Sequence, residues 1–312
     1  MFNRRNTGLG VIALLWIFST NAYSDSNIAV IPSIALLEKN IDFKQSQSGP
    51  LSSLHGNFSA DIPMLDLSLT AGLNKWFLTL KYDFALTDTT VKTSENSIRT
   101  GSGSDQYFWQ PPGTLMQVGR DDKNITLGYS VTSNGNFFVG YMQGETNIEP
   151  PPTCENPVVQ PGGPGPLGTS IYCQSYNFSW LRLRQNNTIS PTSPLAKYTQ
   201  TYTEEGPFVG FSYAMNIHDA GALSFSAAYA DMRGRFKDNI QVFGLQGFDA
   251  SGDVSGTSVA LTWTQPLGES SSYFIDLRQQ SYKMTALDNQ TQQQFKTKEV
   301  MSSLALGLQL YF

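Results

Sequence analysis

The chain has 312 residues and a formal net charge of −5, and only 14% of its residues are charged, against about 25% in ordinary soluble domains. This acidic balance argues against a nucleic-acid partner, because phosphate binding needs basic patches and the sequence shows none.

The first 24 residues have the features of a secretory signal. Residues 1–5 carry Arg4 and Arg5, residues 9–18 form an apolar run, and small residues suit cleavage after Ser24 or, alternatively, after Ala22. The run is too short to span a bilayer as a helix, and no other segment has eighteen consecutive apolar residues. We therefore expect an exported chain of residues 25–312, with 18 basic and 25 acidic residues and a net charge of −7.

Alternating segments follow along the rest of the chain. Leu65, Leu67 and Leu69, for example, share one face of a strand, while Asp66 and Ser68 share the other. A β-sandwich would alternate too, but its solvent face would carry more Lys and Glu than the small residues seen here. Small inward residues favour an all-β fold, a single closed antiparallel transmembrane β-barrel. The predicted strands are 26–38, 61–73, 75–87, 123–133, 136–147, 206–217, 221–233, 255–266, 271–284 and 297–312.

The connections between these segments alternate in length. Short links at 73–74, 133–136, 216–221 and 267–271 separate long polar stretches at 39–60, 88–122, 148–206, 234–254 and 286–296. Transmembrane barrels have short periplasmic turns and long extracellular loops. We therefore expect ten strands, with both termini in the periplasm.

Residues 148–206 leave a twelve-strand alternative open. Segments 176–184 and 197–203 could be two further strands. Against this, Arg182 and Arg184 would share a face with Trp180 and lie near lipid; a β-ribbon above the membrane rim avoids that cost.

The chain ends on an alternating segment that stops at an aromatic residue. Five large apolar side chains share one face, and Ser303, Ala305, Gly307 and Gln309 share the other; the apolar five are Leu304, Leu306, Leu308, Leu310 and Phe312. This ending resembles the final strand of bacterial outer-membrane β-barrels, a broad class with no particular family indicated. The resemblance implies the outer membrane of a Gram-negative bacterium, contact with its lipid and lipopolysaccharide, and recognition of the last strand by the barrel-assembly machinery. Trp76, Tyr273 and Phe312 are expected among the aromatic residues of the membrane interface.

Cys154 and Cys173 are the only cysteines, and both fall in the longest predicted loop. In an oxidising compartment such a pair predicts a disulfide, which on the chain-entropy model contributes roughly 3 kcal/mol. A zinc site would need more ligands, and a redox pair would usually be spaced C-x-x-C.

The sequence offers little for catalysis. His55 and His218, the two histidines, fall in a predicted surface loop and a predicted periplasmic turn, on opposite sides of the membrane. No G-x-S-x-G motif occurs, and the sequence lacks the motifs of the outer-membrane phospholipase, the omptin proteases and the lipid A-modifying barrels. We predict no catalytic residues, cofactor or metal, with an outer-membrane hydrolase as a minor alternative.

Two pairs of acidic residues in predicted loops have a possible role at the membrane surface. The pairs Asp121–Asp122 and Asp249/Asp253 could bind a divalent cation or bridge lipopolysaccharide. Such acids in loops are usually only solvated.

Ionisable residues on the inward face are the more informative candidates. With the turn at 73–74, Asp66 is predicted opposite Lys81, with Asp83 diagonal, and Asp276 and Arg278 share the lumen face of another strand. These charges predict either an ion-pair lattice that fills a small lumen or a constriction that selects small polar solutes.

Small inward residues are expected to leave room along the axis; they include Gly128, Gly210, Ala228, Ala260 and Gly307. The functional hypothesis is therefore a porin-like channel for small polar solutes. The alternative is a non-conducting surface barrel that acts in adhesion, surface interaction or envelope integrity.

Overall fold

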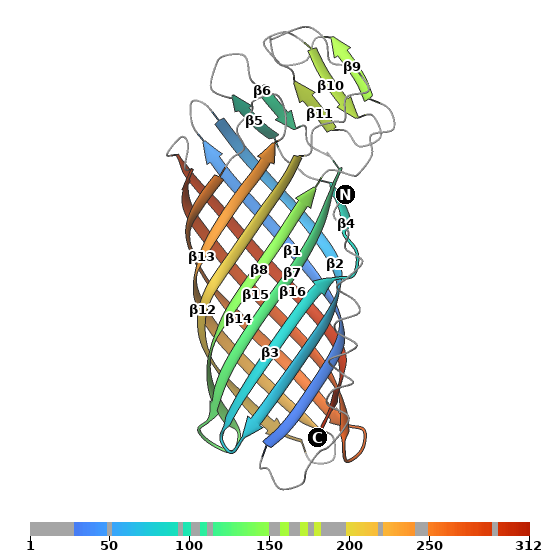
Figure 1. Cartoon of the computed structure of the whole chain (residues 1–312), viewed down its shortest axis with the longest axis vertical. Coiled ribbons are helices and arrows are strands. Elements are labelled where there is room, and N and C mark those ends of the chain that lie inside the picture. The colour runs from blue at the N-terminus through green and yellow to red at the C-terminus, as the bar shows by residue number, and fades with distance from the viewer. Residues whose placement is uncertain are drawn as a thin grey trace.

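The computed structural model describes residues 28–48, 52–92, 96–100, 107–110, 115–149, 157–161, 169–173, 178–181, 198–217, 221–240, 249–288 and 293–312. Ten antiparallel strands in this part of the chain close into a barrel (Figure 1). The described residues contain no helix long and apolar enough to cross a membrane. The predicted signal, residues 1–24, lies outside them.

The ring follows chain order, so each strand pairs with the next one that belongs to the ring. Its members are β1 (Ile28–Ser48), β2 (Ser52–Leu73), β3 (Trp76–Ala85), β7 (Leu115–Ser130), β8 (Gly135–Glu149), β12 (Tyr198–Asn216), β13 (Ala222–Ile240), β14 (Asp249–Pro266), β15 (Ser271–Asp288) and β16 (Gln294–Leu310). The short β4 (Thr89–Lys92) continues the course of β3 along β7. β16 pairs with β1, and Val30 and Phe312 exchange backbone hydrogen bonds of 3.2 and 3.1 Å. The last residue therefore takes part in closing the barrel.

Five short strands lie outside this ring. β5 (Asn96–Thr100) pairs with the first residues of β2 and with β6 (Tyr107–Gln110). β9 (Pro157–Pro161), β10 (Thr169–Cys173) and β11 (Phe178–Leu181) form a separate three-stranded sheet. Figure 1 shows all five beyond the end of the barrel that is opposite the C-terminus. We call that end distal and the end with Phe312 proximal.

The twelve-strand alternative is wrong. The segment around Trp180 pairs with β10 in the small sheet, and the segment beginning at 197 runs directly into β12, a strand already counted. Cys173 is the last residue of β10, but Cys154 lies outside the described residues, so their disulfide remains a prediction.

Nine of the ten ring strands are longer than predicted; the exception is β3, which has 10 residues. β1 runs to Ser48 and β2 begins at Ser52, so most of the stretch 39–60, expected to be a loop, is strand. The other long stretches are likewise entered by β7, β12, β13, β14, β15 and β16. A tilted strand needs only about nine to eleven residues to cross a bilayer, so strands of 15 to 22 residues continue well past the lipid.

The extra length was missed because the polarity of the two faces reverses along a strand, as β1 shows. On β1, Ile34 and Leu36 point outward, whereas Ile41 and Phe43 point inward and are fully buried. The outward positions after Leu36 are polar, beginning with Glu38. The proximal half therefore has its apolar face outside, as lipid requires, and the distal half has its apolar face inside, as in a water-soluble barrel.

The outward apolar residues of the proximal half form what we call the lipid band. Exposed leucines, isoleucines, valines and aromatic residues from all ten strands contribute to it; examples are Ile34, Leu36, Leu73, Leu78, Leu80, Leu127, Val139, Phe211, Phe225, Leu261, Leu277, Leu306 and Leu308. A continuous apolar belt of this kind would be unfavourable in water, and it is the expected surface of a barrel in a bilayer.

The hairpin of β2 and β3 corrects the predicted register. The turn is Asn74–Lys75, with Leu73 paired to Trp76 and with Asn74 at a φ of 57°. Asp66 is therefore opposite Asp83, and Lys81 is opposite Ser68. The error is two residues, which keeps every side chain on its predicted face because the side-chain period of a strand is two.

Candidate functional site

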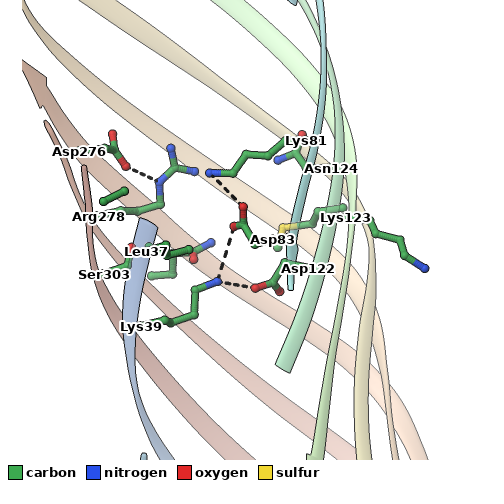
Figure 2. Close-up of a pocket in the computed structure, with 13 residues that line it drawn as sticks. Leu37, Lys39, Lys81, Asp83, Asp122, Lys123, Asn124, Asp276, Arg278 and Ser303 are labelled. Atoms are coloured by element: carbon green, nitrogen blue, oxygen red, sulfur yellow. Dashed lines mark hydrogen bonds and ion pairs between the residues drawn. The ribbon is translucent and has the colours of Figure 1, made fainter. Parts of the chain in front are cut away.

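Charged side chains gather inside the barrel between the two halves. They come from β1, β2, β3, β7, β12, β15 and β16, and we call them the charge layer: Lys39, Asp66, Lys81, Asp83, Arg120, Asp122, Glu204, Asp276, Arg278 and Glu299. Each is on the inward face because it follows the alternation of its strand. Figure 2 shows part of this layer.

Two lysines bridge the carboxylates on one side of the layer. Lys81 Nζ lies 2.9 Å from Asp66 Oδ2 and 3.5 Å from Asp83 Oδ1. Lys39 Nζ lies 3.9 Å from Asp83 Oδ2 and donates a hydrogen bond to Asp122. Asp83 therefore lies between the two ammonium groups (Figure 2). Because β1 and β7 are not neighbours in the ring, the Lys39–Asp122 pair spans the interior.

Arg120 is fully enclosed, with a side chain that is 0% exposed, as are those of Glu204 and Glu299. Its Nε donates to Asp122 Oδ1 at 2.9 Å, its Nη1 to Glu299 Oε1 at 2.7 Å, and its Nη2 to Glu204 Oε1 at 2.6 Å. Nη1 also donates to Thr146 Oγ1 at 2.8 Å. One guanidinium thus ties β7 to β8, β12 and β16.

The third part of the layer lies on β15. Thr262 Oγ1 donates to Asp276 Oδ1 at 2.5 Å, and Arg278 Nε lies 3.6 Å from Asp276 Oδ2. A cavity of about 40 Å³ adjoins this pair and is also lined by Lys39, Lys81 and Asp83. Such a volume has room for a few water molecules.

The charges of the layer do not cancel. It contains six carboxylates against four cations, Lys39, Lys81, Arg120 and Arg278. Buried Oε2 atoms of Glu204 and Glu299 have no hydrogen-bond partner in the structure. Burial of unpaired charge is costly, so the stability of the layer depends on the contacts that its lysines and arginines make.

The five charged residues predicted to face the lumen all belong to the charge layer. Of the other five members, Lys39, Arg120, Asp122 and Glu204 were missed because they fall in stretches interpreted as polar loops. Glu299 falls in the predicted strand 297–312 but was not singled out among its inward residues. The usable signal was the alternation of apolar residues beside them, such as Ile41 and Phe43, in the opposite phase from the lipid band.

The acidic pairs proposed as cation sites are arranged differently. Asp122 points inward to Arg120 and Lys39, while Asp121 is its outward neighbour on β7. Asp249 pairs with Arg235 at 2.5 Å, and Asp253 is opposite Arg233 across the strands. Within the described ranges, no group of three or more metal-binding side chains is placed to hold a metal ion.

Aromatic rings occupy the space beside several inward glycines that were expected to leave room along the axis. Four inward glycines are each covered by a phenylalanine ring from the residue paired with them on the neighbouring strand. The pairs are Phe77 over Gly128, Phe208 over Gly140, Phe138 over Gly210 and Phe274 over Gly307. A Cβ atom added to any of these glycines would overlap the ring. Glycine is therefore needed at these positions to make space for the four aromatic rings.

Buried apolar side chains fill the distal half. Phe43 stacks on Phe58 with ring centroids 5.3 Å apart, and Phe236 lies 5.0 Å from Phe295. Met64, Met116, Met232 and Tyr282 belong to the same buried cluster. The interior thus has three levels along the axis: rings over glycines, the charge layer and this apolar core.

The predicted interface aromatics lie on the outer surface near the proximal end. Trp76 and Phe312 are 53% and 56% exposed, and the Trp76 ring centroid is 4.8 Å from that of Tyr129. Tyr273 is on β15 two residues before the outward Ile275. His55 lies in β2 rather than in a loop, with its side chain outside the described set, as is the whole of His218.

No family model and no curated protein matches the sequence. Among solved structures, the outer-membrane protease OmpT from Escherichia coli is similar with a TM-score of 0.56 and 10% identity, over 94% of this chain and 99% of that one. The toluene transporter TodX from Pseudomonas putida gives a TM-score of 0.33 with 9% identity, over 93% and 91% of the two chains. A FadL homologue from Pseudomonas aeruginosa gives 0.28 with 8% identity, over 92% and 90%. The OmpT similarity shows the fold; with the lipid band, it identifies this chain as a β-barrel of the bacterial outer membrane.

Proposed function

We propose that this protein is a non-conducting outer-membrane barrel that supports surface segments at its distal end for surface interaction. The observation that carries the proposal is the buried apolar core that fills the distal half of the barrel. An ion moving along the axis would have to pass the Phe–Gly pairs, the charge layer and the apolar core. A barrel of ten strands is close in size to those that side chains can fill, whereas porins with sixteen or more strands hold water channels.

The shape of the barrel supports the surface role. Its distal half has polar residues outside and an apolar core inside, so it is suited to stand in water beyond the lipid. The strands β5, β6 and β9 to β11 lie at that end (Figure 1). A rigid barrel would present these segments to external partners at a constant distance from the membrane.

Conductance in a planar bilayer tests the proposal. We expect the purified full chain to give no ion-conducting steps, while a sixteen-stranded porin added to the same membrane serves as the positive control. Steps from the wild type whose ion selectivity changes in Asp276→Asn and Arg278→Gln would overturn the proposal and establish a pore lined by these residues.

A porin-like channel for small polar solutes is the second candidate. The observation that favours it is the cavity of about 40 Å³ beside Lys81, Asp83 and Arg278, which gives the interior a small polar space. Passage would require side chains of the charge layer to move aside. Swelling of proteoliposomes in small sugars, faster than with protein-free liposomes, would support this candidate over the first.

An enzyme is not the function we propose. OmpT is a protease, but at 10% identity the similarity extends to the fold alone. The buried carboxylates of the charge layer are engaged by lysines and arginines.

A further inference from the structure

Four lysines come together on the outer wall of the distal half. Lys298 on β16 is directly opposite Lys283 on β15 and directly opposite Lys44 on β1, so the three form one row across adjacent strands. Lys296 is two residues from Lys298 on the same face. All four side chains are exposed, and we call them the lysine cluster. This basic patch could not be recognised in the sequence, because its members are up to 254 positions apart, from 44 to 298.

The cluster is electrostatically unfavourable by itself. Like charges directly opposite each other on one face of a sheet repel. None of the four lysines has an ion pair within the described part of the chain. Asp42, on the same face two residues before Lys44, is opposite Val300, and Asp253 on β14 is opposite Arg233. The surface therefore has a surplus of positive charge in a chain of net charge −5.

The height of the cluster restricts the chemistry of its ligand. Six residues separate Leu304, in the lipid band, from Lys298, and six separate Leu277 from Lys283. At about 3.3 Å per residue and a tilt of about 40°, the row lies roughly 15 Å beyond the edge of the hydrocarbon. The headgroup layer of an ordinary phospholipid extends only about 5–8 Å past that edge. Anionic groups carried on sugars, above the headgroup phosphates, fit this height.

We infer that the lysine cluster binds the phosphate and carboxylate groups on the core sugars of outer-leaflet lipopolysaccharide. The inference rests on the orientation in which the distal half projects from the cell. It is independent of whether the barrel conducts. A glycolipid held there would neutralise the row of lysines and contact the wall formed by β15, β16 and β1.

Two charge-matched variants test this site. The first replaces Lys44, Lys283, Lys296 and Lys298 with glutamine. The control replaces four exposed lysines elsewhere, Lys75, Lys92, Lys123 and Lys237, with glutamine and has the same net charge. Both variants are made in the full chain, refolded in detergent and checked for strand content before use.

Binding is measured with two probes, lipopolysaccharide that retains its phosphorylated core sugars and lipid A that lacks them. We expect the cluster variant to bind the first probe roughly tenfold or more weakly than the wild type, while the control stays within about twofold. Binding of lipid A should be equal for all three proteins. Replacement of the four lysines of the cluster with arginine should retain binding. Equal losses in the cluster variant and the control, no loss in either, or an equal loss for both probes would each overturn the inference.

Discussion

Arg120 and Glu299 are hydrogen-bonded at 2.7 Å across the inside of the barrel, although 179 positions separate them in the chain. Their strands, β7 and β16, are not neighbours in the ring. The bond therefore joins two separate parts of the barrel wall, and both side chains are 0% exposed. Loss of either partner leaves buried charge that water cannot reach.

We expect Arg120→Met to destabilise the barrel by about 3–5 kcal/mol, because Asp122, Glu204 and Glu299 would lose their shared cation. Arg235→Met is the control; it breaks an exposed pair with Asp249 and should cost at most about 1 kcal/mol. The free energy of unfolding of each variant is measured by urea unfolding of the refolded protein in detergent. Similar losses for the two variants would mean that the interior is more hydrated than the structure indicates.

Lys81 and Asp66 should be energetically coupled despite their diagonal arrangement, because their charged atoms are 2.9 Å apart. In a double-mutant cycle of Asp66→Asn and Lys81→Met, we expect a coupling energy of roughly 0.5–3 kcal/mol. Thermal unfolding of the four proteins provides it. Additive effects would contradict the pairing seen between β2 and β3.

Gly210→Ala should destabilise the proximal half, because its new methyl group would overlap the ring of Phe138. Overpacking of this kind costs about 1–3 kcal/mol. Gly268→Ala is the matched control, since a Cβ at that position meets nothing within 4 Å. If the two alanine variants unfold at the same temperature, the ring of Phe138 does not occupy the space beside Gly210.

The exposed Arg235–Asp249 pair predicts a small dependence of stability on pH. The hydrogen bond from Arg235 lowers the pKa of Asp249 from its ordinary value. The pair therefore stabilises the fold fully above the unfolded pKa of about 3.9, and this contribution disappears as pH falls through the lower folded pKa. Because the side chains are 54% and 26% exposed, we expect less than about 1 kcal/mol. The difference between wild type and Asp249→Asn in unfolding midpoint should be constant from pH 7 to about 5 and vanish near pH 2; a difference that grows on acidification would contradict this assignment.

Cysteine labelling on intact cells tests the orientation. Asp249→Cys, at the distal start of β14, should react with a membrane-impermeant thiol reagent. Asn134→Cys, in the proximal turn between β7 and β8, should not react until the outer membrane is permeabilised. The wild type gives the background from Cys154 and Cys173. Labelling of Asn134→Cys alone would invert the topology.

The number of strands and their facing could be predicted because both depend on local pattern. The side-chain period of two correctly predicted an inward position for five charged residues: Asp66, Lys81, Asp83, Asp276 and Arg278. The two-residue error in the register of β2 and β3 did not change the face on which a side chain lies. The register itself depended on whether Lys75 belongs to the turn, which the alternation does not determine.

The distal half could not be recognised by the same rule. On β1 the outward apolar pattern ends at Leu36, because the next outward residue is Glu38, although the strand continues to Ser48. Similarly, the contents of the lumen depend on contacts between distant strands. Gly210 suggested open space, but its neighbour Phe138 lies more than seventy positions away and fills it.

The change from the outward apolar Leu36 to the outward charged Glu38 also determines how deeply the barrel is inserted in the bilayer. Sliding the barrel along its axis would draw charged residues into hydrocarbon at one rim and push leucines into water at the other, so the protein has one preferred depth. The wall from Glu38 to Gln47 then stands roughly 25 Å above that depth at about 3.3 Å per residue and a tilt of about 40°. The distal end of the barrel therefore stands at a set height above the lipid surface.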